Sequence, residues 1–257
     1  MSTPLLELSG LTIRFGGLTA VDRLDMKIPV SNIRALIGPN GAGKSTVFNA
    51  ITGIYRPTEG RITFQGQDIT GKHPYRISAL GIARTFQNIR LYKTLSVLDN
   101  VRIGAHGIGR GGLFGAIVRP PGIKAEERRI NEASGDALEL VGLLRKKDER
   151  ADSLSYGEQR RLEIARALVS APQILLLDEP AAGMNPQEKE RLMLMIQQIA
   201  ARGVTIFLVE HDMKFVMALA QQVTVLDYGR KICTGTPDEV QSNLSVIEAY
   251  LGKEEAV

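Results

Sequence analysis

The stretch GPNGAGKST, residues 38–46, decides the fold of this chain. It satisfies the pattern G-x-x-x-x-G-K-[ST], follows the apolar run IRALI and opens the helical pattern of residues 44–52. Glycines let successive backbone N–H groups converge on phosphate oxygens, and a helix N-terminus adds positive potential there. Lys44 can neutralise the β- and γ-phosphates, and the Ser45 hydroxyl can coordinate Mg²⁺. The stretch therefore predicts a nucleotide site formed by Gly38, Pro39, Asn40, Gly41, Ala42, Gly43, Lys44, Ser45 and Thr46.

Polar side chains with matching chemistry follow further along the chain. The apolar run ILLLDEP, residues 174–180, ends in Asp178, which is expected to hold Mg²⁺, and Glu179, which can polarise an attacking water. His211 ends the next apolar run, at the sheet edge where ligands bind in open α/β folds, and can contact the γ-phosphate. The Gln87 amide can complete the Mg²⁺ and water shell.

The periodicity of the sequence changes twice. Before residue 70, apolar and β-branched residues recur at period two between Gly, Pro and Asn, which predicts strands and hairpins. From about residue 75 to 170 strand patterns stop, and helical spacing predicts a mostly helical region. The Gly-rich residues 104–122 inside it predict a long flexible loop. They include a G-x-G-x-x-G at Gly107, Gly109 and Gly112, which opens no helical pattern and is interpreted as loop composition.

After residue 170 the alternation of strands and helices returns. The apolar runs at 173–180 and 204–212 are separated by the helical pattern of residues 186–202. Continuous apolar runs of strand length are typical of a parallel sheet covered on both faces. Residues 223–235 then predict a hairpin, and short helices are expected between 237 and 251.

Composition limits the classes of function. Lys and Arg number 32 against 28 Asp and Glu, and they are dispersed rather than gathered in a block with aromatics, so no nucleic-acid partner is expected. The single cysteine, Cys233, excludes an internal disulfide framework and is interpreted as a small strand residue. No apolar stretch reaches the roughly 18 residues of a membrane span, and MSTPLLELSG lacks the features of a signal peptide, so a cytoplasmic location is expected.

The stretch LSYGEQRR, residues 154–161, has two interpretations. Ser155 followed by Glu158 matches a capping box, in which each side chain satisfies a free N–H at a helix start. The second comes from the resemblance given below, which implies that the Ser155 hydroxyl, the Gly157 N–H and the helix start meet a γ-phosphate. The sequence leaves open whether Glu158 caps the helix or faces a nucleotide.

The phosphate loop, Gln87, LSYGEQ, ILLLDEP and His211 occur in that order, and the set resembles the ATPase cassette of ABC transporters across nearly the whole chain. The resemblance implies one cassette over 1–257 with an α/β P-loop NTPase core and a mostly parallel sheet. An N-terminal antiparallel β subdomain and a helical subdomain are also implied. The core would comprise about 1–86 and 171–257, and the helical subdomain with the signature motif about 87–170.

The same resemblance implies a mechanism. ATP and Mg²⁺ would be the cofactors, Phe15 would stack on adenine, and Glu179 would be the general base. The loop PAAGMN, residues 180–185, would link two nucleotide sites. The signature residues Ser155, Gly157 and Glu158 would line the ATP of a second ATPase subunit, because two cassettes close head to tail around two ATP molecules. Tyr156, Glu158 and Asn185 depart from the usual Gly, Gln and Asp of these motifs.

A finer resemblance rests on LSYGEQRRLEIARAL, LDEPAAGMNP, VEHDMKFVM, the Gly-rich insert and the ending GTPDEV…IEAYLG. These phrases are similar to the ATP-binding subunit of branched-chain amino acid importers. The implied partners are a second ATPase subunit, homo- or heterodimeric, two permeases and a periplasmic binding protein. The implied location is the cytoplasmic face of the inner membrane. A urea importer ATPase, a lipopolysaccharide-export ATPase and a soluble ABC protein remain alternatives.

Overall fold

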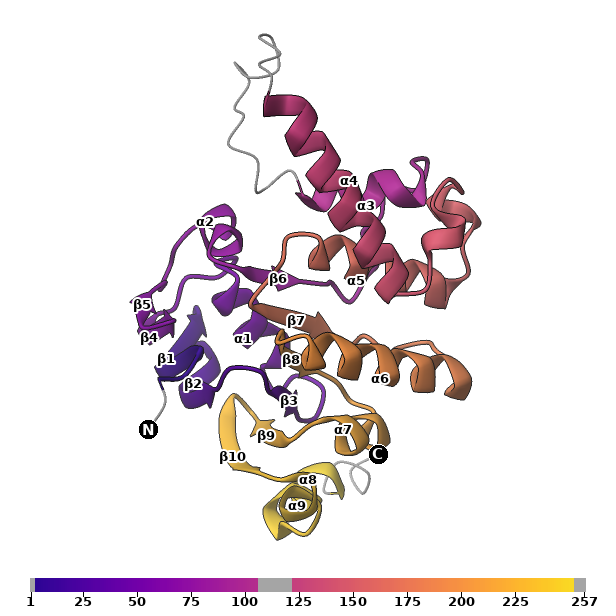
Figure 1. Cartoon of the computed structure of the whole chain (residues 1–257). Coiled ribbons are helices and arrows are strands. Elements are labelled where there is room, and N and C mark those ends of the chain that lie inside the picture. Colours follow the sequence, from indigo (N-terminus) through magenta and orange to yellow (C-terminus); the bar gives the residue numbers. More distant parts are fainter. Residues whose placement is uncertain (1–2, 106–121, 252–257) are drawn as a thin grey trace.

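The computed structural model describes residues 3–105 and 122–251, and its strands form two sheets (Figure 1). The larger sheet has the order β10-β9-β3-β8-β7-β6, in which all neighbours are parallel except β10 and β9. Its strands are β3 (Ile33–Ile37), β6 (Ile82–Arg84), β7 (Ile174–Asp178), β8 (Thr205–Val209), β9 (Gln222–Asp227) and β10 (Arg230–Gly235). The smaller, antiparallel sheet consists of β1 (Leu6–Phe15), β2 (Leu18–Ile28), β4 (Glu59–Phe64) and β5 (Gln67–Asp68).

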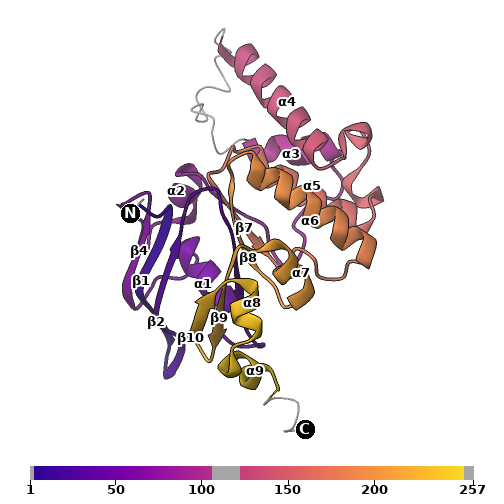
Figure 2. The ribbon, with the colours of Figure 1, turned by 60° about the horizontal axis from the view of Figure 1, so that its bottom comes forward.

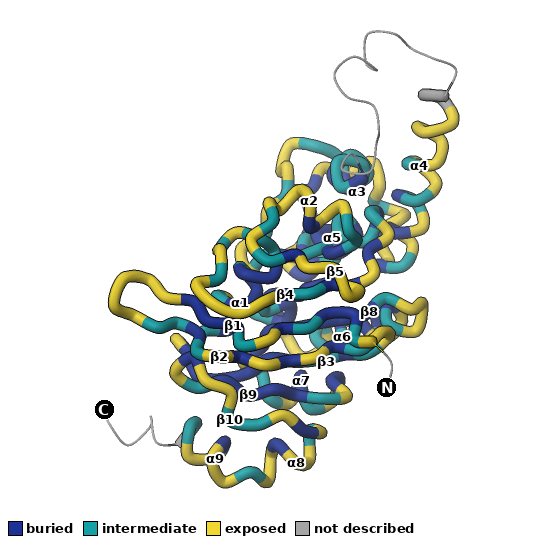
Figure 3. The backbone as a smooth tube through the Cα atoms, turned by 90° about the vertical axis from the view of Figure 1, so that its left-hand side faces the viewer, coloured by how far each residue is buried: buried dark blue, intermediate teal, exposed yellow. Residues whose placement is uncertain are grey.

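Both faces of the larger sheet are buried, which explains its uninterrupted apolar runs. In β7, Leu175 and Leu177 belong to one apolar cluster, while Ile174 and Leu176 belong to the other. The first cluster joins the sheet to α6 (Pro186–Ala201), α7 (Met213–Leu219), α8 (Pro237–Gln241) and α9 (Leu244–Leu251). The second places α1 (Lys44–Ile51) between the two sheets. The central strands are accordingly the most deeply buried part of the fold (Figure 3).

The helices between residues 97 and 168 gather at one end of the molecule (Figures 1 and 2). They are α3 (Val97–Ala105), α4 (Gly122–Leu140), α5 (Tyr156–Leu168) and the short 3-10 turns Leu144–Lys146 and Ala151–Ser153. The remaining helix, α2 (Pro74–Ala79), precedes β6. None of the helices in the described ranges combines the length and apolar composition that crossing a membrane requires. The division of the chain near residues 87 and 171 stays a prediction.

Two expectations were wrong in detail. β6 lies at residues 82–84, inside the region where no strand was expected, because three residues at a sheet edge are too few to show a period. Gly104 and Ala105 are helical in α3, and α4 begins at Gly122, so both ends of the expected Gly-rich loop are helix. The backbone carbonyl of Arg166 lies so close that only glycine fits at position 104. The G-x-G-x-x-G at 107–112 lies outside the described residues.

The parallel strands bring the predicted site residues to one edge of the sheet. The phosphate loop follows β3, the segment with Gln87 follows β6, Glu179 follows β7, and His211 follows β8. The register pairs Leu36 and Asp178 with the same residue of β8, Val209, so these strand ends lie level. Residues separated by up to about 170 positions in the sequence therefore meet where α/β sheets bind ligands.

Candidate nucleotide site

The phosphate loop has a backbone that only glycine adopts easily. Gly43, at the N-cap of α1, has φ 99°, and a Cβ there would lie 2.4 Å from the Ala20 carbonyl oxygen. No N-cap side chain bonds to the start of α1, and the N-terminus of a helix attracts anions. The buried Lys44 ammonium donates to the carbonyls of Gly38 at 2.7 Å and Pro39 at 2.9 Å, which holds it inside the loop.

A cleft of about 470 Å³ opens over this loop, within the size range of small-molecule sites. Phe15 lines this cleft, and 43% of its surface is exposed. Its ring packs edge-on against the Tyr55 ring, with 5.1 Å between the two ring centroids. The half-exposed ring is therefore available for stacking on a base. The cleft is lined by Phe15, Leu18, Thr19, Ala20, Asn40, Gly41, Ala42, Gly43, Lys44, Ser45, Thr46, Gln87, Glu179 and Tyr228.

Asp178 is buried at the end of β7 and is held by a residue that the sequence did not single out. Its Oδ2 lies 2.7 Å from Nη2 of Arg84, which is also buried. Arg84 comes from β6, and its Nη1 donates to Asn49 Oδ1 on α1 at 2.7 Å. The pair thus ties the carboxylate of one strand to the neighbouring strand and to the helix that begins at the phosphate loop. Only the three-residue strand β6 brings Arg84 there, which is why sequence patterns gave no signal.

Oxygen donors suited to Mg²⁺ converge on the same region. Ser45 and Gln87 line the cleft, and Asp178 is the last residue of β7. Within residues 3–105 and 122–251, no three His, Cys, Asp or Glu side chains form a metal cage. Mg²⁺ usually binds one or two carboxylates together with water and substrate phosphates, and Asp178 and the Ser45 hydroxyl are donors of that kind.

Glu179 lies at the meeting point of three strand ends. Its Oε2 accepts a hydrogen bond from Gln87 Nε2 at 3.0 Å and lies 3.6 Å from His211 Nδ1. The Glu179 backbone has φ 45° and donates to the Val209 carbonyl at 2.9 Å. A non-glycine residue in this region is strained, and such strain concentrates at functional sites. The structure thus brings together Gln87, Glu179 and His211.

Glu210, immediately before His211, is a second residue that the sequence reasoning missed. It is fully buried, and its carboxylate accepts from the N–H groups of Ala181 at 2.7 Å, His211 at 3.1 Å and Asp212 at 3.4 Å. Burial raises its pKa, although these hydrogen bonds oppose the shift. Glu210 therefore ties the loop that follows β7, which begins at Glu179, to the loop that follows β8. An acidic residue inside an apolar run was the only available signal.

The signature stretch lies apart from this cleft. The capping box at α5 is confirmed, because Ser155 N donates to Glu158 Oε2 at 3.0 Å and Glu158 N donates to Ser155 Oγ at 3.4 Å. Glu158 Oε1 also lies 3.0 Å from Lys146 Nζ. Burial acts to raise the pKa of Glu158, but the bonds from Lys146 and Ser155 outweigh it and lower the pKa. Both carboxylate oxygens of Glu158 are thus engaged within the chain.

The start of α5 packs closely against the loop and helix that follow β7. The half-exposed Tyr156 ring packs against Gly183. A Cβ added to Gly183 would lie 3.3 Å from Cε1 of that ring. A Cβ on Gly157 would lie 2.7 Å from Oε1 of the Glu188 side chain, which would have to shift to admit it. Asn185 and Glu188 form a second capping box at the start of α6. Ser155, Gly157 and Glu158 line a separate cavity of about 330 Å³ and not the nucleotide cleft.

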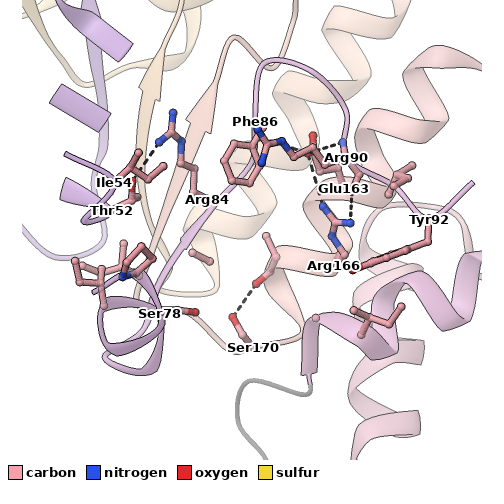
Figure 4. Close-up of a pocket in the computed structure, with 18 residues that line it drawn as sticks. Thr52, Ile54, Ser78, Arg84, Phe86, Arg90, Tyr92, Glu163, Arg166 and Ser170 are labelled. Atoms are coloured by element: carbon pink, nitrogen blue, oxygen red, sulfur yellow. Dashed lines mark hydrogen bonds and ion pairs between the residues drawn. The ribbon is translucent and has the colours of Figure 1, made fainter. Parts of the chain in front are cut away.

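A further cleft of about 590 Å³ separates α2 and β6 from α3 and α5 (Figure 4). Its walls are largely apolar, with Ile54 and Tyr92 exposed at 48% and 53%. Arg90 and Arg166 add cationic groups from the side of the helices (Figure 4). This surface combines exposed apolar side chains with positive charge, which is typical of a docking site.

Comparisons with known proteins agree with this geometry. Residues 21–182 match the family model described as ABC transporter, and residues 230–256 match that of the branched-chain amino acid ATP-binding cassette transporter. The chain is 42% identical to the high-affinity branched-chain amino acid transport ATP-binding protein BraF of Pseudomonas aeruginosa, over 98% of this chain and 100% of that protein. LivG of Escherichia coli K12, which bears the same description, has the same identity and coverage.

Solved structures share the fold. The ADP conformation of the ATP-binding cassette MJ1267 superposes with a TM-score of 0.86 at 31% identity, covering 98% of this chain and 100% of that one. A nucleotide-free cassette from an ABC transporter gives 0.85 at 31% identity, covering 96% and 99%. Family match, full-length relatives and the α/β P-loop architecture coincide. The chain therefore belongs to the ABC transporter family, as one of its ATPase cassettes.

Proposed function

We propose that this cassette is the ATP-hydrolysing motor of an importer for branched-chain amino acids. The observation that carries the proposal is the 42% identity, over 98% of the chain, to proteins described as branched-chain amino acid transport ATP-binding proteins. The match of residues 230–256 to the branched-chain model supports it independently of the nucleotide motifs. The solute itself does not contact an ATPase subunit, so the specificity comes from the partners.

In the proposed reaction, the phosphate loop binds ATP and Phe15 stacks on adenine. Glu179 accepts a proton from the attacking water, Gln87 orients that water, and His211 donates to the γ-phosphate. Mg²⁺, held through Ser45, Asp178 and Gln87, would neutralise charge on the β- and γ-phosphates. The hydrogen bond between Gln87 and Glu179 supports this assignment, because it places the amide and the base around one position.

The separation of the signature stretch from the cleft supports a composite site. Ser155 is exposed and Gly157 is buried at the start of α5, and both lie outside the cleft of their own chain. In a head-to-tail dimer they complete the site of the partner subunit, with ATP between the two surfaces. Glu158 stays a candidate contact there, although its oxygens cap α5 and pair with Lys146. Binding and hydrolysis of ATP then shift the population between closed and open dimers.

The cleft between α2, β6, α3 and α5 is the proposed docking place of a permease. A permease segment in this cleft would touch β6 of the large sheet on one side and the helices α3 and α5 on the other. Motion of these helices relative to the sheet would therefore be passed on to the permease. Two permeases would hold the dimer at the cytoplasmic face of the inner membrane, and a periplasmic binding protein would deliver the solute. Replacing the exposed Tyr92 by Asp would reduce stimulation by permeases and leave the basal hydrolysis of the isolated chain unchanged.

The uptake of radiolabelled solutes tests the whole proposal. Deleting the gene in its native host should abolish high-affinity uptake of leucine, isoleucine and valine, and re-expression of the chain should restore it. Re-expression of Glu179→Gln should not. Loss of urea uptake, or loss of surface lipopolysaccharide, with normal amino-acid uptake would instead identify one of the alternative transporters. Normal behaviour in all three assays would contradict the transport role.

A further inference from the structure

A buried ionic cluster lies on α5, directly against the segment that carries Gln87. The side chains of Arg160 and Glu163 are 0% and 1% exposed, and Arg160 Nη1 lies 3.0 Å from Glu163 Oε2. Arg166 approaches the other carboxylate oxygen, Oε1, at 3.8 Å. Burial of charge is strongly unfavourable unless each group is paired and hydrogen-bonded, so the remaining partners of these groups are informative.

Those partners are backbone groups of residues 86–90, together with the Tyr156 hydroxyl, which lies 3.3 Å from Arg160 Nη2. Arg160 Nη1 donates to the Phe86 carbonyl at 2.5 Å, and Nη2 donates to the Gln87 carbonyl at 2.7 Å. Glu163 Oε1 accepts from the N–H groups of Phe86 at 3.4 Å and Arg90 at 3.3 Å. Arg166 donates to the Arg90 carbonyl. Figure 4 shows the contacts of Glu163 with both ends of the segment and the contact of Arg166 with the Arg90 end.

The contact of Arg160 is the most specific of these. A guanidinium presents several N–H donors in one plane and can hold two neighbouring carbonyls and a carboxylate together, whereas an ammonium cannot reproduce that fork. The Gln87 carbonyl held in this way belongs to the residue whose side chain donates to Glu179 Oε2. The same helix, α5, begins at Ser155.

We propose that Arg160 is a positioning residue: by tying the carbonyls of Phe86 and Gln87 to α5, it sets the Gln87 amide against Glu179 and makes Gln87 move with the helix that starts at Ser155. The proposal deepens the proposed function and rests on the role of Gln87 in hydrolysis. A force applied by a partner's nucleotide at Ser155 would thereby reach Gln87 through one helix. Arg160 itself lines neither the nucleotide cleft nor the cavity at Ser155.

A double-mutant cycle tests whether Arg160 acts through Gln87. Steady-state phosphate release would be measured for the full chain, Arg160→Lys, Gln87→Ala and the double variant. Arg160→Lys should lower kcat about tenfold with little change in KM for ATP, and should add less than about twofold in the Gln87→Ala background. Equal losses in both backgrounds, or a change confined to KM, would overturn the proposal.

A second readout follows the segment without hydrolysis. The chain contains no tryptophan, so Asn88→Trp introduces a single indole into an exposed position of the segment. Its fluorescence anisotropy should fall when Arg160→Lys is added. The matched control is Arg161→Lys, the next residue of α5, whose Nη1 donates to the Val141 carbonyl instead. Unchanged anisotropy in Arg160→Lys, or an equal fall in both, would contradict the hold on the segment.

A paired replacement covers the case in which Arg160→Lys fails to fold. Arg160→Leu with Glu163→Leu removes both buried charges together, which core packing tolerates better than an unpaired charge. It should give the same loss of kcat, again absent in the Gln87→Ala background. If Gln87→Ala alone keeps the wild-type kcat, the proposed role of Gln87 fails and the catalytic part of this inference is overturned with it. The anisotropy then decides separately whether Arg160 holds the segment.

Discussion

Gln87 Nε2 donates a hydrogen bond to Glu179 Oε2 at 3.0 Å, joining the segment after β6 to the strained residue that follows β7. His211 Nδ1 lies 3.6 Å from the same oxygen. One carboxylate oxygen thus has neighbours from the segments that follow two other strands, β6 and β8, and Glu179 lines the same cleft as Lys44. Gln87 and His211 can therefore orient this carboxylate.

The first prediction concerns that carboxylate. Glu179→Gln keeps the size and the hydrogen bonds of the side chain but cannot accept a proton. We expect ATP binding to persist, turnover to fall by roughly 10² to 10⁴, and an ATP-bound dimer to accumulate. Phosphate release and gel filtration with ATP measure the two effects. Glu126→Gln, an exposed change on α4, serves as the control, and a wild-type rate in Glu179→Gln would refute the assignment.

The second prediction tests the composite site by mixing two inactive variants. Lys44→Ala removes the phosphate-binding ammonium of one chain, and Ser155→Ala removes the signature hydroxyl. In a mixed dimer one site carries both defects, whereas the other combines an intact loop with an intact signature stretch. We therefore expect the mixture to recover hydrolysis that neither variant has alone, with a maximum at equal amounts. Activity that stays at the sum of the two variants would show that each chain hydrolyses independently.

Glycine patterns, apolar runs and the order of motifs were sufficient to predict that the phosphate loop, Glu179 and His211 lie at one edge of the sheet. The loop at Lys44 depends on local backbone geometry, and Glu179 follows a strand whose apolar run is unmistakable. Arg84, Arg160 and Glu210 could not be predicted, because each acts through a partner distant in the sequence. Arg84 meets Asp178 only through β6, and Arg160 meets the Gln87 carbonyl only through the packing of α5. Periodicity reports which face is buried, but not which backbone group a buried charge meets.

The third prediction uses the raised pKa of Glu210. Burial raises this pKa above the ordinary value of 4.5, so the folded chain binds the proton more tightly than the unfolded chain. The free energy of unfolding should therefore fall as pH rises from about 4.5 through the raised pKa. Glu210→Gln removes this titration and should flatten the decline without abolishing it, because the pKa of Glu163 is also raised by burial. Urea unfolding across this pH range measures the slope, and an unaltered slope in Glu210→Gln would contradict the argument.

The fourth prediction compares two glycines inside helices. A Cβ on Gly104 would lie 2.1 Å from the Arg166 carbonyl oxygen and 2.9 Å from Val169 Cγ1, so α3 and α5 must separate to admit alanine. We expect Gly104→Ala to lower the free energy of unfolding by about 1 to 3 kcal/mol, the usual cost of overpacking. Gly135, on α4, has no atom within 4 Å of such a Cβ.

Gly135→Ala is therefore the matched control, and it should raise the stability by roughly 0.5 to 1 kcal/mol, because alanine loses less backbone entropy in a helix than glycine. Denaturant unfolding of the two variants gives effects of opposite sign if the close approach of α3 and α5 is real.

Since Arg166 also holds the Arg90 carbonyl, the displaced α5 in Gly104→Ala should shift residues 86–90 as well. Hydrolysis should then fall in Gly104→Ala and stay unchanged in Gly135→Ala, and equal activity in both would mean that α5 and Gln87 are not mechanically linked.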